Sequence, residues 1–153
     1  MTRIVAKPFP LQTLLELSQL RMDDAARQLG QLLAGEQKAG ERLILLQQYR
    51  AEYHERFVLA LRGGIGRDAW NNFQAFLSRL DDAIAQAEAM VAQSRQRTAA
   101  GQREWVDKRG RVQAFDTLSQ RHHDRVQTAE NRQEQKAQDE HAARNHPERE
   151  EED

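Results

Sequence analysis

Residues 53–80 read YHERFVLALRGGIGRDAWNNFQAFLSRL, and in this stretch two apolar helical patterns meet at a glycine cluster. Gly63, Gly64 and Gly66 supply the backbone freedom that a helix end and a tight reversal of the chain require. Asp68 is a suitable N-cap for a second helix that starts just ahead of Trp70. The stretch therefore predicts two helices that fold back on each other around the glycines.

The apolar residues on both sides of the glycines follow a seven-residue repeat, spaced alternately three and four residues apart. From Leu11 to Ala60, twelve of the fifteen positions in this series are apolar, and from Trp70 to Ala129 twelve of eighteen are. A stripe that repeats every 3.5 residues faces one neighbouring helix along its length, which is typical of a coiled coil. We call these positions the seam. They predict an all-α fold: a long two-helix antiparallel coiled-coil hairpin whose second helix is longer than the first.

The first half of the chain is expected to contain an arm, a helix and the turn. Pro8 and Pro10 prevent an earlier regular helix, so residues 1–10 should form a flexible N-terminal arm. The first helix should span residues 11–62, and the glycine-rich turn residues 63–67.

The second helix should span residues 68–142, because no proline occurs within it. Folding about the turn pairs residues whose numbers sum to about 130. The longer helix should therefore overhang the first one, without a partner, after about residue 120. Residues 143–153 end in an acidic run and are expected to be a disordered tail.

The composition restricts the range of functions. The chain has 39% hydrophobic and 31% charged residues, which suits a thin protein with little interior. It has no cysteine, which excludes disulfides and thiolate metal sites and fits a reducing cytoplasm. Nothing at its start resembles a signal peptide, and no apolar run reaches the roughly 20 residues of a membrane span, so we expect no membrane insertion. The formal net charge of -1 gives no bias towards nucleic acid.

No catalytic, cofactor or metal site is expected. The glycine cluster lacks the Lys-Ser or Lys-Thr that completes a phosphate-binding loop. His122 and His123 are adjacent, so on a helix they point about 100° apart and cannot share a metal. A basic stretch could meet phosphates, but ion pairing on an exposed helix face is the favoured interpretation for Arg95, Arg97, Arg103, Lys108, Arg109 and Arg111.

Two features of the seam are unusual. Glu36 and Arg50 interrupt it, either as residues that set the register or as tolerated positions at its edge. Small seam residues, by contrast, predict a thin and weakly packed segment in the middle of the hairpin: Ala39, Ser94, Thr98 and Gly101.

Some apolar residues lie outside the seam. Tyr49 and Phe76 are one residue away from it, and the pairing rule places them beside seam residues as one flank of the hairpin. Exposed aromatic clusters of this kind often mark partner sites, whereas the alternative is extra packing near the turn. The flank consists of Leu46, Tyr49, Tyr53, Phe76, Leu80 and Ala83.

Four features of the sequence occur together in a fixed order: DDAARQLG at 23–30, Tyr49 with Glu52-Tyr53, WNNFQAFLSRLDDAI at 70–84 and AENRQEQKAQDE at 129–140. Together they resemble the bacterial flagellar export protein FliJ family. The resemblance extends from about Leu11 to Ala142. It implies a non-enzymatic, soluble component of the flagellar type III export apparatus, in the cytoplasm and peripherally associated with the inner membrane.

The resemblance also implies partners. FliJ-like proteins are similar to the central stalk of rotary ATPases, insert into the hexameric ring of the export ATPase, contact the transmembrane export gate and are associated with export chaperones. The gate contact would fall on the flank Leu46, Tyr49, Tyr53, Phe76, Leu80 and Ala83. The ring contact would fall on Glu130, Asn131, Arg132, Gln135, Lys136, Asp139 and Glu140.

Other functions stay open at this point. The runner-up is a coiled-coil export chaperone or scaffold with no role in an ATPase ring, and the third is a coiled coil associated with nucleic acid. The free chain is expected to be a monomer, because the pairing rule sets large seam residues against small ones within one chain.

Overall fold

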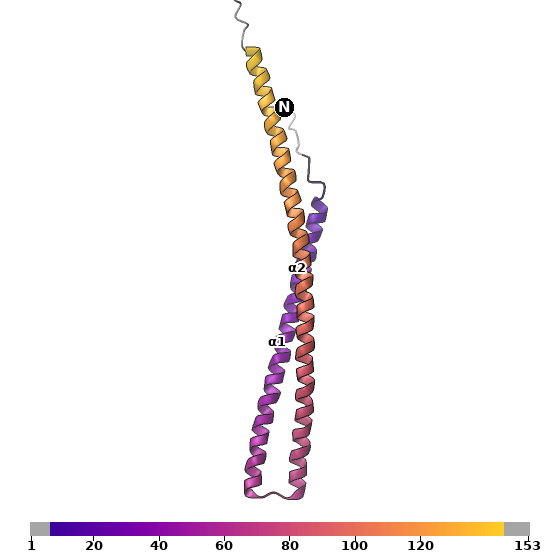
Figure 1. The fold of residues 1–153 in the computed structure, drawn as a ribbon, viewed down its shortest axis with the longest axis vertical. Helices are drawn as coiled ribbons and strands as arrows, with labels where there is room; N and C mark the ends of the chain where they lie inside the picture. The colour runs from indigo at the N-terminus through magenta and orange to yellow at the C-terminus, as the bar shows by residue number, and fades with distance from the viewer. Residues whose placement is uncertain (1–6, 146–153) are drawn as a thin grey trace, which may run out of the picture. The chain divides into compact units, whose positions relative to one another are not determined.

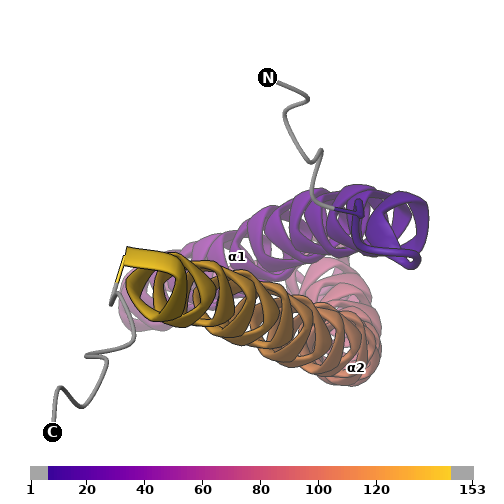
Figure 2. The ribbon, with the colours of Figure 1, turned by 90° about the horizontal axis from the view of Figure 1, so that it is seen from above.

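The structure is a computed structural model that describes residues 7–145. Two helices account for nearly all of these residues: α1, Gln12–Gly63, and α2, Arg67–Asn145. Each helix is continuous (Figures 1 and 2), and the described part of the chain contains no strand. The predicted fold class, an all-α two-helix hairpin with a longer second helix, is confirmed.

The turn between the helices is short (Figure 1). Gly64 has a φ of 79°, a left-handed conformation that side chains other than glycine disfavour. Its N–H donates to the Leu61 carbonyl at 3.2 Å, which closes the end of α1. The Trp70 N–H donates to the Gly66 carbonyl at 3.0 Å in the first turn of α2. The chain thus reverses over Gly64, Ile65 and Gly66.

The helices form two compact units, which we describe separately. The turn unit is Met22–Lys108, and it holds most of α1, the turn and the first half of α2. The terminal unit comprises the described residues 7–21 and 109–145. Residues 1–6 and 146–153, which belong to the expected arm and tail, lie outside the described residues.

The core of the turn unit is the seam. Its buried apolar residues all occupy seam positions: Ala25, Phe57, Leu77, Leu80, Ala87 and Val91. Thr98 is buried as well, and its hydroxyl donates to the Leu32 carbonyl at 3.4 Å. Because Thr98 and Leu32 are a pair under the predicted rule, the register of the antiparallel pairing is confirmed in this unit.

The small seam residues do not weaken the packing as the sequence suggested. A Cβ on Gly101 would lie 2.6 Å from Leu32 Cδ1, so the leucine side chain already occupies the space that a larger residue would need. Leu29 Cδ1 is 3.7 Å from the same point. The absence of a side chain lets the partner helix pack directly on the backbone of α2, and the expectation of a loose segment is wrong at Thr98 and Gly101.

The polar interruptions of the seam form ion pairs between the helices. Arg50 donates through Nε to Asp81 Oδ1, and its Nη2 lies 3.4 Å from Asp81 Oδ2. Hydrogen bonding from Arg50 holds the pKa of Asp81 below its ordinary value, and the same bond raises the pKa of Arg50. The second interruption, Glu36, lies 3.9 Å from Arg95 Nε. In both ion pairs the two residue numbers sum to about 130, as the pairing rule requires. Glu36 and Arg50 are therefore consistent with residues that set the register of the two helices.

In the terminal unit, the start of α1 packs on α2 through the buried seam residues Leu15 and Val112. The described part of the arm continues this packing, because the Phe9 ring lies 5.7 Å from the His122 ring. His122 Nε2 is 3.0 Å from the Lys7 carbonyl, to which it donates. The arm thus lies against α2 at these residues, so His122 has a partner from the arm although it lies beyond the predicted start of the overhang at about residue 120.

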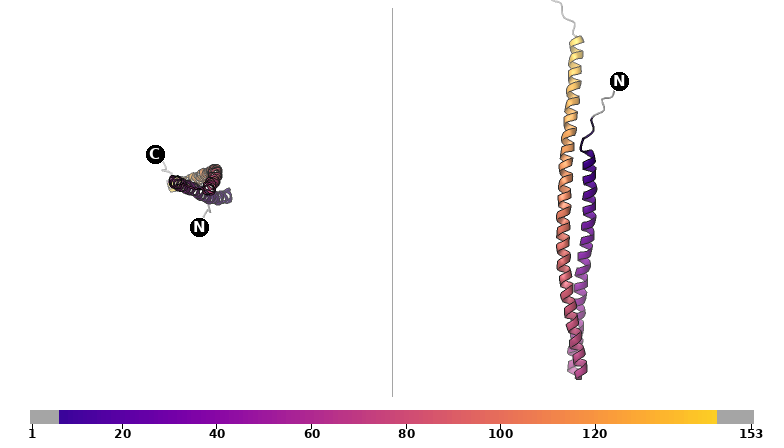
Figure 3. Two further views of the ribbon diagram at one scale, coloured as in Figure 1. Left: turned by 90° about the horizontal axis from the view of Figure 1, so that it is seen from below. Right: turned by 90° about the vertical axis from the view of Figure 1, so that its right-hand side faces the viewer.

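The end of α2 differs from the expected boundary. The helix continues to Asn145, three residues beyond the predicted end at 142, so residues 143–145 are helical rather than part of a disordered tail. Asn145 Nδ2 lies 2.9 Å from His141 Nε2, a contact across one helical turn. From 127 to 145 every residue is exposed. The end of α2 extends past the start of α1 with no described helix beside it (Figure 3, right).

Candidate partner-binding surface

The most distinctive surface of the turn unit is a cluster of six aromatic rings, three from each helix. Tyr53 and Phe76 are the closest pair, with ring centroids 4.4 Å apart, and Tyr49 meets the other side of Phe76 edge-on at 6.1 Å. Further contacts of 5.2–5.3 Å continue the series towards the turn. Pairs in this range of distance and tilt are favourable. The six residues are Tyr49, Tyr53, Phe57, Trp70, Phe73 and Phe76.

The structure places the predicted gate-contacting residues in three different environments. Tyr49 is exposed, at 43% of its full accessible surface. Leu46, Tyr53, Phe76 and Ala83 are half-buried. Leu80 is only 7% exposed and belongs to the core, so it supports the surface from beneath and cannot itself anchor a partner in this conformation.

The pairing rule brought the aromatic residues of this flank together correctly, but the flank is not separate from the core. Phe76 packs on the seam residue Tyr53, which in turn packs on Phe73 at 5.3 Å. Phe76 therefore packs between the two helices while part of its side chain stays exposed. Tyr49 contributes one ring contact and otherwise faces solvent, so it can serve a partner.

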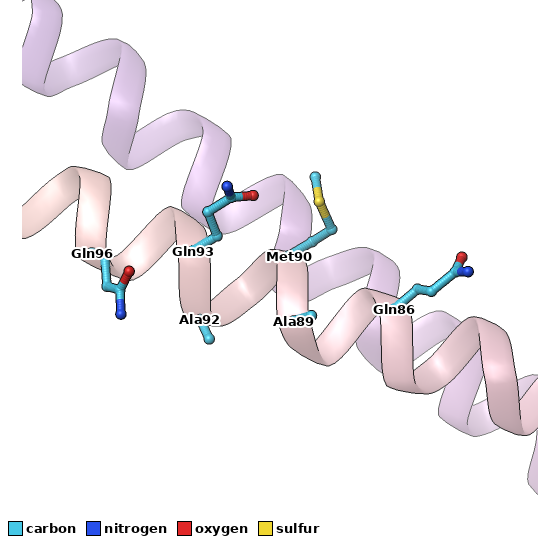
Figure 4. A pocket seen from close by; sticks show the side chains of 6 residues that line it. All are labelled: Gln86, Ala89, Met90, Ala92, Gln93 and Gln96. Atoms are coloured by element: carbon cyan, nitrogen blue, oxygen red, sulfur yellow. The ribbon is translucent and has the colours of Figure 1, made fainter.

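Two large apolar residues on the same part of the hairpin were missed by the sequence reasoning. Leu45 is 66% exposed and Met90 is 55% exposed. Met90 borders a shallow depression of about 700 Å³, and Gln86, Met90 and Gln93 project from one side of α2 there (Figure 4). A signal for Met90 exists in the sequence, because it lies two repeats of seven after Phe76.

The residues predicted to contact the ATPase ring all lie on the exposed last part of α2. No hydrogen bond or ion pair to α1 involves any of them within residues 7–145. The structure brings them onto one helix but places no other element against them (Figure 3). They are Glu130, Asn131, Arg132, Gln135, Lys136, Asp139 and Glu140.

The basic stretch is partly neutralised by ion pairs. Lys108 Nζ is 3.3 Å from Glu104, four residues earlier on α2, and Arg95 faces Glu36 on the other helix. Asp107, Arg109 and Arg111 also have interaction partners. The ion pairs of Lys108 and Arg95 agree with the interpretation of this stretch as an ion-paired helix face.

Within the described range, no group of three or more His, Asp or Glu side chains could hold a metal ion. Neither described helix has an apolar window suited to crossing a bilayer. The depressions on the surface are shallow and are lined by side chains along the helix flanks.

The fold and its exposed flanks define a class of protein: a long two-helix hairpin with aromatic and large apolar side chains exposed along its helices. The family model of the "Flagellar FliJ protein" matches residues 7–151. The chain is 37% identical over 134 residues to the flagellar FliJ proteins of Salmonella typhi and of Escherichia coli (strain K12), covering 88% of this chain and 91% of each relative. The chain belongs to the FliJ family.

Proposed function

We propose that this member of the FliJ family is the central stalk of the flagellar export ATPase ring and also contacts the export gate, on the cytoplasmic side of the inner membrane. Family membership makes the chain a component of the flagellar export apparatus. The stalk role rests on one observation above all: residues 127–145 form a helix with no partner from α1.

A single helix of this composition is marginal in water. Isolated helices shorter than roughly 12–15 residues rarely persist, and longer ones gain most of their stability from packing. This segment is rich in Arg, Gln and Glu and has no apolar face of its own. A ring that surrounds the segment would contact it from all sides at once, and those contacts would offset the entropy lost on ordering it.

A truncated chain that ends at Thr128 tests the proposal. It keeps the Phe9–His122 contact and the paired part of the seam, so its melting temperature should match that of the paired helices in the full chain. It should lose binding to the ATPase hexamer and any effect on the rate of ATP hydrolysis. A matched control is the full chain with the exposed residues Gln113 and Asp116 changed to Ala, which should behave as the unmodified chain does.

The rate of ATP hydrolysis by the ring also distinguishes the proposed stalk from the alternative function, an export chaperone or scaffold. An export chaperone or scaffold would bind export chaperones and leave the hydrolysis rate of the ring unchanged. Full ring binding by the chain that ends at Thr128 would contradict the proposed contact. Chaperone handling is compatible with the stalk role, and we include it in the proposal.

The gate contact is proposed on the exposed side of the aromatic cluster. Tyr49 is the anchor of this contact, because it is exposed and its ring is held in place by Phe76. Tyr and Trp side chains are enriched among residues that dominate binding energy. Leu46, Tyr53 and Ala83 would form the rim around it.

A further inference from the structure

Exposed apolar residues continue along one flank of the turn unit beyond the aromatic cluster. On α2, Phe76, Ala83 and Met90 are seven residues apart, and each immediately precedes a seam residue, so they share one helix face. On α1, Leu45 lies one turn before Tyr49 and shares its face. The contact between Tyr49 and Phe76 shows that these two faces meet on the same flank.

We infer that the gate-binding surface of this chain is a longer strip, in which Leu45 and Met90 are apolar anchors beside Tyr49. The inference rests on the proposed gate contact and extends it away from the turn. The strip would take a segment of the gate's cytoplasmic domain that presents apolar side chains flanked by acidic ones.

The exposure of Leu45 and Met90 supports the assignment. Both expose more than half of their surface, so neither is held in place by the core. Truncating them removes little packing, and burying them under a partner would remove a large apolar area from water. Methionine adapts to irregular partner surfaces because its side chain is unbranched and flexible.

The polar residues around the strip indicate what kind of segment fits. Gln86 and Gln93 lie on the same side of α2 as Met90, one turn before and one turn after it (Figure 4). Their amides can both donate and accept, as a peptide backbone requires. An apolar side chain of the partner would then enter the depression beside Met90 while its main chain bonds to the two amides.

The charges on this flank are mostly positive. Arg42 and Arg56 each lie seven residues from Tyr49, and Arg79 lies one turn after Phe76, so the repeat places all three on the flank. All are exposed. A second copy of this chain would bring the same arginines together in a two-fold interface, which like-charge repulsion disfavours. An acidic partner segment would be attracted, and its binding should weaken as the salt concentration rises.

Calorimetric titration of the full chain with the purified cytoplasmic domain of the gate tests the strip. Leu45→Ala and Met90→Ala should each weaken binding roughly tenfold, which corresponds to the loss of one well-buried anchor. The matched control is Leu33→Ala. Leu33 is 51% exposed, but it immediately follows the seam residue Leu32 and so lies on the opposite flank. The Leu33→Ala variant should bind the gate domain with unchanged affinity. Circular dichroism should show the same helicity for all three variants.

The outcomes separate the strip from the gate contact itself. If the unmodified chain does not bind the gate domain, the proposed gate contact is wrong and the strip with it. If Tyr49→Ala weakens binding while Leu45→Ala and Met90→Ala do not, the gate contact stands and the longer strip is overturned. If sedimentation equilibrium shows a dimer that Met90→Ala disrupts, the occupant is a second copy, which also overturns the inference.

Discussion

Among single residues, the Arg50–Asp81 pair is the most specific contact between the two helices. Its geometry engages both carboxylate oxygens, and it connects positions that only the correct register brings together. A shift of one helix by a single turn would separate the two charges. We therefore regard this pair as a device for register rather than a large source of stability, since both side chains stay partly exposed.

The pair should make stability depend on pH in the acid range. The folded chain lowers the pKa of Asp81, so its contribution is complete above the ordinary value of 3.8 and is lost as the pH falls through the lower folded value. The melting temperature of Asp81→Asn should lie below that of the unmodified chain at neutral pH, and the two should converge as the pH falls below the lowered pKa of Asp81. Asp82→Asn is the control, because Asp82 is exposed and has no hydrogen bond or ion pair to α1 within residues 7–145. An equal loss in both variants would argue against the pair.

Replacing Gly101 by alanine should change the stability of the fold differently from the same substitution at an open helical glycine. A Cβ added to Gly30 would have nothing within 4 Å, so Gly30→Ala should raise stability by about 0.5–1 kcal/mol through helix propensity. At Gly101 the same change meets Leu32 Cδ1, and the leucine must leave its position. Gly101→Ala should therefore gain less than Gly30→Ala, or lose stability, in urea unfolding followed by circular dichroism. An equal increase in the free energy of unfolding for Gly30→Ala and Gly101→Ala would show that Leu32 can move without a loss of stability.

Between elements, the aromatic cluster joins the two helices next to the turn. Within residues 7–145, Phe76 has ring contacts with Tyr53 and Tyr49, whereas the one ring contact of Tyr49 is with Phe76. Removing the Phe76 side chain therefore opens a gap between the two helices, whereas removing the Tyr49 side chain changes mainly the exposed surface. The two residues have the same position relative to the seam, but they differ in what they support.

Thermal unfolding should show this difference. Phe76→Ala should cost about 1–3 kcal/mol, because the side chain is half-buried and loses two ring contacts. Tyr49→Ala should cost less than about 1 kcal/mol, the value of one edge-on ring contact. Leu77→Ala, on the seam, serves as the reference for a core residue and should cost about 2–5 kcal/mol. Similar costs for Phe76→Ala and Tyr49→Ala would contradict the distinction.

Most of the fold was predictable from sequence because a coiled-coil seam is a one-dimensional signal. The repeat fixed which face of each helix is buried, and the glycine turn fixed the register. What the sequence did not decide is how deep a side chain lies within that interface. Leu80 was placed on the surface although it is a seam residue, and Met90 was overlooked although it lies on the exposed flank. Depth depends on how closely the helices approach, as at Gly101, and periodicity carries no information on that distance.

The arm shows a second limit of the sequence reasoning. Pro8 and Pro10 correctly exclude a helix at residues 7–10, but they do not exclude packing. The Phe9–His122 and Lys7–His122 contacts arise because His122 continues the seam of α2 past the start of α1. A segment without regular structure can be held in place by a contact with a distant aromatic side chain. The local sequence of the segment does not predict such a contact.

At the scale of the whole molecule, the main structural feature is the pairing of α1 with α2 within one chain. The absence of cysteine makes this easy to test, because two introduced residues are the only ones that can react. In Leu32→Cys with Thr98→Cys, oxidation should give a crosslink within a single chain, because these positions face each other across the seam. The product should migrate as a monomer in a denaturing gel. The control pair Leu33→Cys with Thr98→Cys should react more slowly, and crosslinks only between chains would favour a dimer.

The aromatic cluster has a consequence for spectroscopy. Both tyrosines of the chain and one of its two tryptophans lie in it. Light absorbed by Tyr49 or Tyr53 can therefore pass to Trp70 as excitation energy, and this transfer should weaken when the helices separate beside the turn. Tyrosine-excited tryptophan emission is thus an intrinsic optical gauge of that end of the hairpin. A partner that separates the two helices beside the turn would change this emission, which can be followed in real time without an attached dye.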